Sequence, residues 1–227
     1  MMTDPRPATG RPRPEGGFVL RPMTCDDCVA TADLHVRHPG DGLFPRLGRR
    51  FVRRWHLTFV QSDHAHGHVA VRPDGEVLGF VAAATDQRAY VTHTLRTART
   101  SLVTRGAVAM LVRPRVTAHF LRTRVKAYWA RLRRPVQTTP AGPRTAVVHA
   151  IVTTPGVRGT GVGRMLLAAV EADVRASGTA CIELLSEDGE HGGANFYRRL
   201  GWTEGTTFVN RDDRTMVRFS RQVGDGS

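Results

Sequence analysis

The chain has 227 residues, of which 41% are hydrophobic, and its 33 lysine and arginine residues against 20 acidic ones give a formal net charge of +13. A chain of this size can bury one substantial core, so we expect a single large domain, or one domain that carries an insertion. It has no apolar run near the ~20 residues of a membrane span, and its opening lacks the apolar middle of a secretory signal. These features predict a cytoplasmic protein.

Residues 1–17 are rich in proline, glycine and arginine and hold almost nothing to bury, so they are predicted to form a disordered leader. We place the domain over residues 18–222 and a tail over residues 223–227. The three cysteines, Cys25, Cys28 and Cys181, are too sparse for a disulfide framework and suit a reducing compartment.

The CDDC pair raises the question of a zinc site, but such a site needs four ligands and Cys181 lies more than 150 residues further along the chain. We favour a helix start instead. Thr24 and Asp27 are spaced as a variant capping box, in which Thr24 accepts an amide hydrogen bond and Asp27 lies in the first turn.

The remaining elements follow in chain order. A strand over residues 18–22 and the capped helix to about Val36 precede a turn-rich loop and an amphipathic helix within residues 49–62. Two apolar runs around Pro73, Asp74 and Gly75 predict a hairpin. After a long middle segment come a continuous apolar strand over residues 146–154, a helix to about Ala176, a strand over residues 179–186, a short helix, and two strands within residues 207–222. This order predicts a mixed α/β fold with one parallel crossover.

The stretch from Arg158 to Arg164 places Gly159, Gly161 and Gly163 between the apolar strand and the helix. Such a turn leaves main-chain N–H groups unpaired at the positive end of a helix dipole, and the two arginines add charged donors, so the segment suits a diphosphate. A P-loop is excluded because the only lysine is Lys126, and the glycine spacing departs from that of dinucleotide-binding loops. A tight turn without a ligand is the structural alternative.

Two motifs resemble a known family. The letters from Arg158 to Gly163 fit the Arg/Gln-x-x-Gly-x-Gly/Ala signature of the GCN5-related N-acetyltransferases (GNAT), and Phe196 to Trp202 resembles the Phe-Tyr-x-x-x-Gly-Phe element of that superfamily. The resemblance covers roughly residues 18–85 and 144–222. It implies the GNAT fold, a mixed central sheet of about six to seven strands flanked by helices.

The resemblance also implies a reaction, in which acetyl-CoA is the acyl donor and a primary amine attacks it directly in a ternary complex, with no metal. The loop would hold the pyrophosphate through Val157, Arg158, Gly159, Thr160, Gly161, Val162, Gly163 and Arg164. The preceding strand would pair with the pantetheine arm through Ile151, Val152 and Thr153. Tyr197 occupies the position of the tyrosine that protonates the CoA sulfur, and it is predicted to be the general acid.

The base is open at this stage. His149 lies where some related enzymes carry a proton-relaying histidine; Glu183, Glu187 and bulk water are the alternatives. Many members of the family carry an asparagine at the position of Glu190, so this chain departs from the pattern there. The alternating His64, His66 and His68 have no ligand partner nearby in the sequence and are expected to flank the first strand of the hairpin.

Residues 86–143 form an insertion between the third and fourth strands, with eleven arginines and Lys126 against one acidic residue, Asp86. Two helical patterns, from Leu95 to Met110 and from Val116 to Leu132, flank Pro114, so the insertion is predicted to be helical. It could cap the acceptor channel and favour an anionic acceptor, bind nucleic acid or an anionic surface, or be a solvated basic face in an arginine-rich protein.

The alternative to an enzyme is a nucleic-acid- or ribosome-binding protein that keeps a vestigial acetyltransferase fold. The acceptor, either a small-molecule or a peptide amine, and the choice between a monomer and a homodimer remain open from the sequence.

Overall fold

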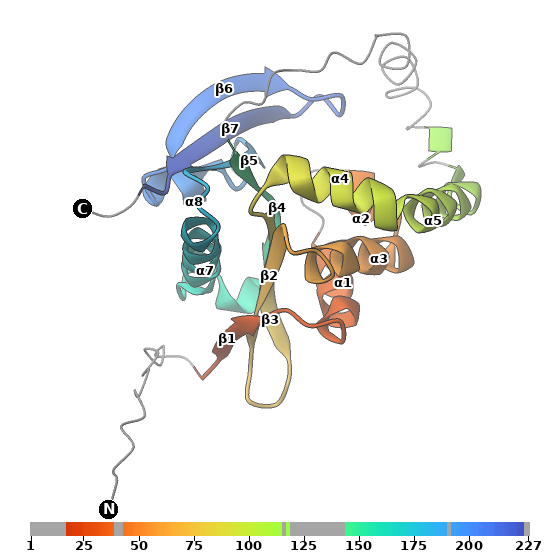
Figure 1. Cartoon of the computed structure of the whole chain (residues 1–227), viewed down its shortest axis with the longest axis horizontal. Coiled ribbons are helices and arrows are strands. Elements are labelled where there is room, and N and C mark those ends of the chain that lie inside the picture. Colours follow the sequence, from red (N-terminus) through yellow and green to blue (C-terminus); the bar gives the residue numbers. More distant parts are fainter. Residues whose placement is uncertain (1–16, 39–42, 115–116, 119–143, 190–191, 225–227) are drawn as a thin grey trace, which may run out of the picture.

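A seven-stranded sheet in the order β1-β2-β3-β4-β5-β7-β6 organises the protein, as the computed structural model in Figure 1 shows. The structure describes residues 17–38, 43–114, 117–118, 144–189 and 192–224. Every neighbouring pair of strands is antiparallel except β4 and β5. The strands are β1 (Val19–Pro22), β2 (Ala65–Val71), β3 (Val77–Ala84), β4 (Thr145–Thr153), β5 (Cys181–Glu187), β6 (Thr203–Val209) and β7 (Thr215–Gln222). The predicted mixed α/β sheet with one parallel crossover is confirmed.

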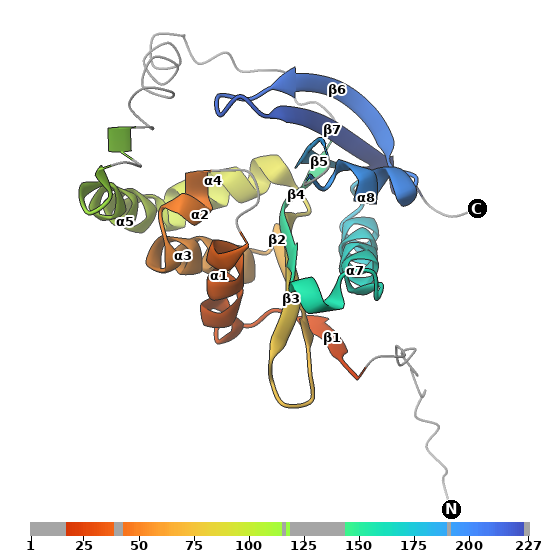
Figure 2. The ribbon, with the colours of Figure 1, turned by 180° about the vertical axis from the view of Figure 1, so that it is seen from behind.

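Helices cover both faces of this sheet. On one face lie α1 (Asp27–Arg37) and α3 (Arg49–Val60), and on the other lies α7 (Val162–Ala176), as Figures 1 and 2 show from opposite sides. The other helical elements are α2 (Leu43–Arg46), α4 (Gln87–Thr97), α5 (Arg99–Leu111), the 3-10 turn η1 (Pro155–Val157) and α8 (Ala194–Arg199). No described helix has the length and apolar character needed to cross a membrane.

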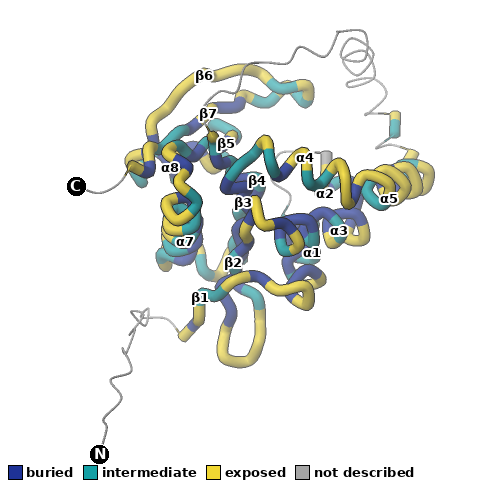
Figure 3. Tube along the Cα trace, in the orientation of Figure 1, coloured by how far each residue is buried: buried dark blue, intermediate teal, exposed yellow. Residues whose placement is uncertain are grey.

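Two apolar cores result, one on each face of the sheet. Along β3, Phe80 and Ala82 join the core under α1 and α3, whereas Val81 and Ala83 join the core under α7. Because side chains alternate along a strand, a strand that is covered on both faces must be apolar throughout. This explains the unbroken apolar letters of the central strands, which Figure 3 shows as buried.

A β-bulge interrupts the alternation in β4. Ala82 pairs with Ala150 and Ala83 pairs with Val148, so His149 has no partner of its own across the ladder. Val148 packs in the core under α7, but Ala150 packs in the core under α1 and α3. The extra residue of the bulge therefore turns both His149 and Ala150 toward α1 and α3.

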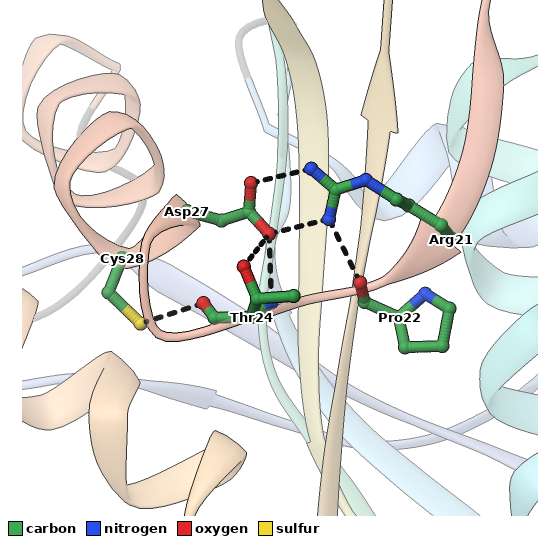
Figure 4. Close-up of polar contacts among 5 residues, drawn as sticks. All are labelled: Arg21, Pro22, Thr24, Asp27 and Cys28. Atoms are coloured by element: carbon green, nitrogen blue, oxygen red, sulfur yellow. Dashed lines mark hydrogen bonds and ion pairs between the residues drawn. The ribbon is translucent and has the colours of Figure 1, made fainter. Parts of the chain in front are cut away.

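The start of α1 differs from the predicted cap. The Asp27 carboxylate accepts hydrogen bonds from both the amide (2.8 Å) and the hydroxyl (2.9 Å) of Thr24, and it also pairs with Arg21 at 2.6 Å (Figure 4). Burial raises the pKa of Asp27, but the bonds from Arg21 and Thr24 outweigh it and lower the pKa below its usual range. Asp27 does lie in the first turn, as predicted. The prediction that Thr24 accepts an amide hydrogen bond is wrong, because Asp26 is the N-cap residue and no side chain caps the helix; the Thr24 hydroxyl donates to the Asp27 carboxylate.

The Cys28 thiol lies in the core and donates to the carbonyl oxygen of Thr24 (3.6 Å), and burial raises its pKa to about 12. No group of three histidine, cysteine or acidic side chains in the described ranges could hold a metal ion.

Other boundaries also differ. The loop after α1 contains the short helix α2, and the helical pattern from Leu95 to Met110 is divided at Ala98 between α4 and α5. β6 begins at Thr203, earlier than predicted. Val223, placed in the tail from the sequence, is buried, and its amide donates to the carbonyl of Ala180. Residues 1–16 and the helical pattern predicted from Val116 to Leu132 lie mostly or wholly outside the described residues.

Candidate active site

The sheet divides between β4 and β5. These strands pair only over Thr145–Val148 and Cys181–Leu184, whereas β4 stays paired with β3 as far as Thr153. A cavity of about 870 Å³ lies at this opening. It is lined by residues 147–153 of β4, residues 184–187 of β5, the end of α1, Arg158, Gly192, Gly193, Tyr197 and Met216.

The predicted pantetheine-binding residues lie on the unpaired part of β4. Ile151, Val152 and Thr153 pair with Val81, Phe80 and Gly79 of β3 on one side, and they line the cavity on the other. One edge of this segment is therefore left without a neighbouring strand. Main-chain groups at such an edge need another hydrogen-bonding partner, which an extended ligand can supply.

Part of the predicted phosphate loop bonds to itself. The amides of Val157, Arg158 and Thr160 donate to the carbonyls of Thr154, Pro155 and Val157, and the Thr160 hydroxyl also donates to Val157 O at 2.8 Å. These three amides stabilise the turn, so they are not free to bind an anion.

The other loop amides are open. The first hydrogen bond of α7 runs from Met165 N to Gly161 O, so the amides of residues 161–164 precede the helix ladder. The amide of Gly159 likewise has no main-chain acceptor within the described part of the chain. Gly161 has a φ of 90°, a left-handed conformation that favours glycine and directs the chain into the helix. Five main-chain donors of the described loop, at Gly159 and residues 161–164, thus have no main-chain acceptor.

Tyr197 lies on α8 and reaches the cavity from the core under α7. Its ring contacts the rings of Phe196, Trp202 and Phe219 and is 6% exposed. Burial raises the pKa of Tyr197 well above its ordinary value, so the hydroxyl keeps its proton across the physiological range. Arg198 anchors the same helix through Asp188 (2.8 Å) and Glu204 (2.7 Å). The structure therefore places a protonated tyrosine hydroxyl in the wall of the cavity.

His149 also lines the cavity, from the opposite face of the sheet. Its Nε2 atom lies 2.7 Å from the Oε1 atom of Gln87, and its ring contacts Trp55, Phe59 and Tyr90. With an amide oxygen as partner, Nε2 carries the hydrogen and Nδ1 keeps the lone pair. Burial lowers the pKa of His149 to about 4, so the ring is neutral at neutral pH and is a weak base.

The two alternative bases are held by arginines. Glu183 pairs with Arg218, and Glu187 pairs with Arg214, each at 2.9 Å. Of the two, only Glu187 lines the cavity. Glu190 lies outside the described residues.

His64, His66 and His68 are not among the described residues that line the cavity. His66 and His68 lie within β2, not beside it. The Asp173 carboxylate of α7 lies 2.6 Å from His68 Nε2 and 3.9 Å from His66 Nδ1. The sequence separation of 105 residues hid this carboxylate partner of His68. His64 precedes the strand.

The cavity also contains residues that were not predicted from the sequence. His35, Arg37 and His38, at the end of α1, form one of its walls. The only signal of this wall was a histidine among the apolar letters of an amphipathic helix, which usually indicates a core residue.

The basic insertion touches the site indirectly. Its first helix, α4, supplies Gln87 and Tyr90, which contact His149. No described residue of α4 or α5 lines the cavity itself, and most of residues 115–143 lies outside the described ranges.

A sheet that opens after one short parallel pair, with a glycine-rich loop and a buried tyrosine at the opening, is the arrangement that the resemblance to the GNAT acetyltransferases implies. Residues 124–202 match the model of the acetyltransferase (GNAT) family. This match agrees with the predicted resemblance and enzyme class, and the predicted fold is confirmed by solved structures. No curated protein sequence is significantly similar to the chain.

Solved structures share the fold at low sequence identity. One, described as an acetyltransferase of the GNAT family from Desulfovibrio desulfuricans, has 16% identity and a TM-score of 0.55 over 91% of this chain and 99% of that one. An aminoglycoside 6'-N-acetyltransferase complexed with coenzyme A has 12% identity and a TM-score of 0.58 over 92% and 99%. The ribosomal-protein-S18-alanine N-acetyltransferase from Escherichia coli has 11% identity and a TM-score of 0.54 over 92% and 96%. At these identities the likeness shows the fold alone.

Proposed function

We propose that this acetyltransferase uses acetyl-CoA as its acyl donor and transfers the acetyl group to a primary amine, by direct attack in a ternary complex. The observation that carries the proposal is the set of five open amides, at Gly159 and residues 161–164, beside the unpaired edge of β4. A diphosphate joined to an extended arm fits these two features together. The coenzyme A that is bound in a neighbour of the same fold supports this choice.

The charge of the loop suits the same ligand. The side chains of Arg158 and Arg164 are exposed, and neither has a carboxylate partner within the described ranges. A guanidinium without an intramolecular partner can form charge-assisted hydrogen bonds with phosphate oxygens. The loop can thus recognise phosphate through both its main chain and its side chains.

Acetyl-CoA supplies an activated acetyl group. When the acceptor nitrogen replaces sulfur on the acyl carbon, one proton must leave the amine and another must reach the thiolate. We assign the second proton to the Tyr197 hydroxyl, because it lines the cavity and its raised pKa keeps it protonated. The amine proton passes to water or to His149, whose Nδ1 atom is the basic nitrogen and whose ring lines the same cavity.

The binding site can be tested with two glycines of one helix. Gly161 and Gly178 flank α7, both have a positive φ, and a Cβ at either meets no atom closer than 4.0 Å. Both Gly161→Asp and Gly178→Asp introduce strain and charge, but only the first places a carboxylate among the open amides. We expect G161D to weaken coenzyme A binding at least tenfold in calorimetry, and G178D to bind like the parent protein.

Equal binding by the two variants, or no coenzyme A binding by the parent protein, would contradict the proposal. Salt-sensitive RNA binding in the absence of coenzyme A binding would support the alternative of a vestigial fold with a nucleic-acid role.

A further inference from the structure

The wall of the cavity formed by α1 carries a hydrogen-bonded chain of side chains. The Thr31 hydroxyl oxygen lies 2.9 Å from His56 Nδ1, and His56 Nε2 lies 3.1 Å from His35 Nδ1. Thr31 and His35 come from α1, and His56 comes from α3. All three residues are buried, and only His35 lines the cavity.

The direction of this chain follows from the threonine. Other helical threonines, such as Thr92 and Thr97, donate to the carbonyl four residues earlier. Within the described part of the chain, Thr31 has no acceptor except His56 Nδ1. His56 Nδ1 therefore accepts, and its Nε2 carries the hydrogen that is donated to His35 Nδ1.

His35 then presents a donor to the cavity. Burial lowers the pKa of His35 to about 4 and that of His56 to about 3, so each ring holds one hydrogen at neutral pH. With Nδ1 accepting, the hydrogen of His35 is on Nε2. Among the described side chains, the buried polar atoms that lack a hydrogen-bond partner belong to Asp33, Thr94 and Trp202, and His35 is not one of these residues. The Nε2–H of His35 thus has access to the cavity.

Arg37, at the end of α1, also lines the cavity. Its side chain is exposed, and its Nε atom makes only a long bond of 3.4 Å to the carbonyl of Asp33. The one carboxylate among the described residues that line the cavity is Glu187, which Arg214 already pairs at 2.9 Å. The described wall therefore offers donors and positive charge, and no unpaired carboxylate for a polycation.

We propose that the acceptor is a small primary amine that also carries an anionic oxygen group, which His35 Nε2–H and the Arg37 guanidinium bind while the amine points toward β4. The inference rests on the proposed function and specifies the substrate of the same site. A neutral imidazole N–H and a guanidinium can each donate a hydrogen bond to an oxygen of a carboxylate or a phosphate. An amine with several positive charges would find no unpaired carboxylate among the described residues of this wall.

Matched acceptors test the inference. Thiol release from acetyl-CoA can be measured with a panel of amino acids and with the carboxamide of each, and with O-phosphoethanolamine against ethanolamine. We expect kcat/KM for the best anionic amine to exceed that of its neutral partner at least tenfold. The two series distinguish a carboxylate from a phosphate. Equal or better turnover of carboxamides, or of spermidine, overturns the inference and leaves the proposed function in place.

Coenzyme A binding separates the two failures. If coenzyme A binds but no anionic amine in the panel is acetylated, the inference is wrong. If coenzyme A does not bind, the proposed function fails and the inference fails with it.

Variants locate the effect on α1. We expect Arg37→Gln to raise KM for the anionic amine at least tenfold, with KM for its carboxamide and the affinity for coenzyme A unchanged. Arg50→Gln, at an exposed arginine of α3 that does not line the cavity, is the matched control and should change neither KM. Thr31→Val removes the hydroxyl that orients the histidines, and it should reduce the preference for the anionic amine severalfold. An unchanged preference in R37Q contradicts the proposed binding site, even if T31V fails to fold.

Discussion

Two tyrosines of this protein are buried and protonated, but only one faces the cavity. Tyr197 lines it, whereas the hydroxyl of Tyr90 lies 2.7 Å from that of Thr58 within the core under α1 and α3. Burial raises the pKa of Tyr90 to about 12 and that of Tyr197 further. Protonation alone therefore does not define the general acid, and access to the reacting atoms does.

The difference can be measured with one substitution at each site. Tyr197→Phe removes the hydroxyl that we assign to thiolate protonation, so kcat should fall by roughly 10- to 100-fold while the dissociation constant of coenzyme A changes little. Tyr90→Phe should keep kcat near that of the parent protein. Stopped-flow or steady-state thiol release checks both, and similar rates for the two variants would remove the role assigned to Tyr197.

At the scale of elements, the start of α7 and the Phe196 ring of α8 constrain each other. A Cβ on Gly163 would lie 3.1 Å from that ring, closer than ordinary contact, whereas a Cβ on Gly106 of α5 would lie 3.5 Å from the Phe51 ring. Both glycines are helical, so alanine gains up to about 1 kcal/mol of helix propensity at each position. Only at Gly163 does a steric cost oppose this gain.

We therefore expect Gly106→Ala to raise the free energy of unfolding by up to about 1 kcal/mol. Gly163→Ala should gain less or lose stability, and it should slow turnover because Phe196 precedes the assigned acid in α8. Chemical denaturation and thiol release measure the two quantities. A gain in stability with full activity in G163A would show that the ring moves aside freely.

Most helices and strands could be predicted from the sequence, and both motifs could be located in it. Hydrophobic periodicity, turn residues and glycine spacing are local properties of the chain. It did not predict the bulge at His149, since the letters around this residue read as an ordinary buried strand. It also missed the wall at the end of α1. The pairing of His35 with His56 depends on how α1 packs against α3, and no local pattern encodes that contact. The sequence assigned too many phosphate-binding amides to the loop, because three of its eight amides bond within the turn.

For the whole molecule, three neutral histidines on one face of the sheet link folding to pH. An unfolded histidine has a pKa of about 6.5, whereas burial lowers the pKa to about 4 for His35, about 3 for His56 and about 4 for His149. Between these values the unfolded chain binds protons that the folded chain excludes. Stability is therefore complete above about pH 6.5 and falls as the pH is lowered toward 4.

Urea unfolding at pH 7, 5.5 and 4.5 should show a loss of several kcal/mol across this interval. His56→Gln removes one of the three groups, so its stability should depend less steeply on pH even if the variant is less stable at pH 7. A free energy of unfolding that is constant from pH 7 to pH 4.5 would contradict the neutral state of these rings.

The divided sheet has a consequence for how such an enzyme can change. In the proposed complex, the acyl carrier is recognised largely by main-chain atoms of β4 and of the loop, which most amino acids supply equally. In the same proposal, the acceptor is recognised by side chains at the end of α1, where each substitution changes the groups that face the amine. Mutations at the end of α1 can therefore change the acceptor specificity while coenzyme A binding is preserved.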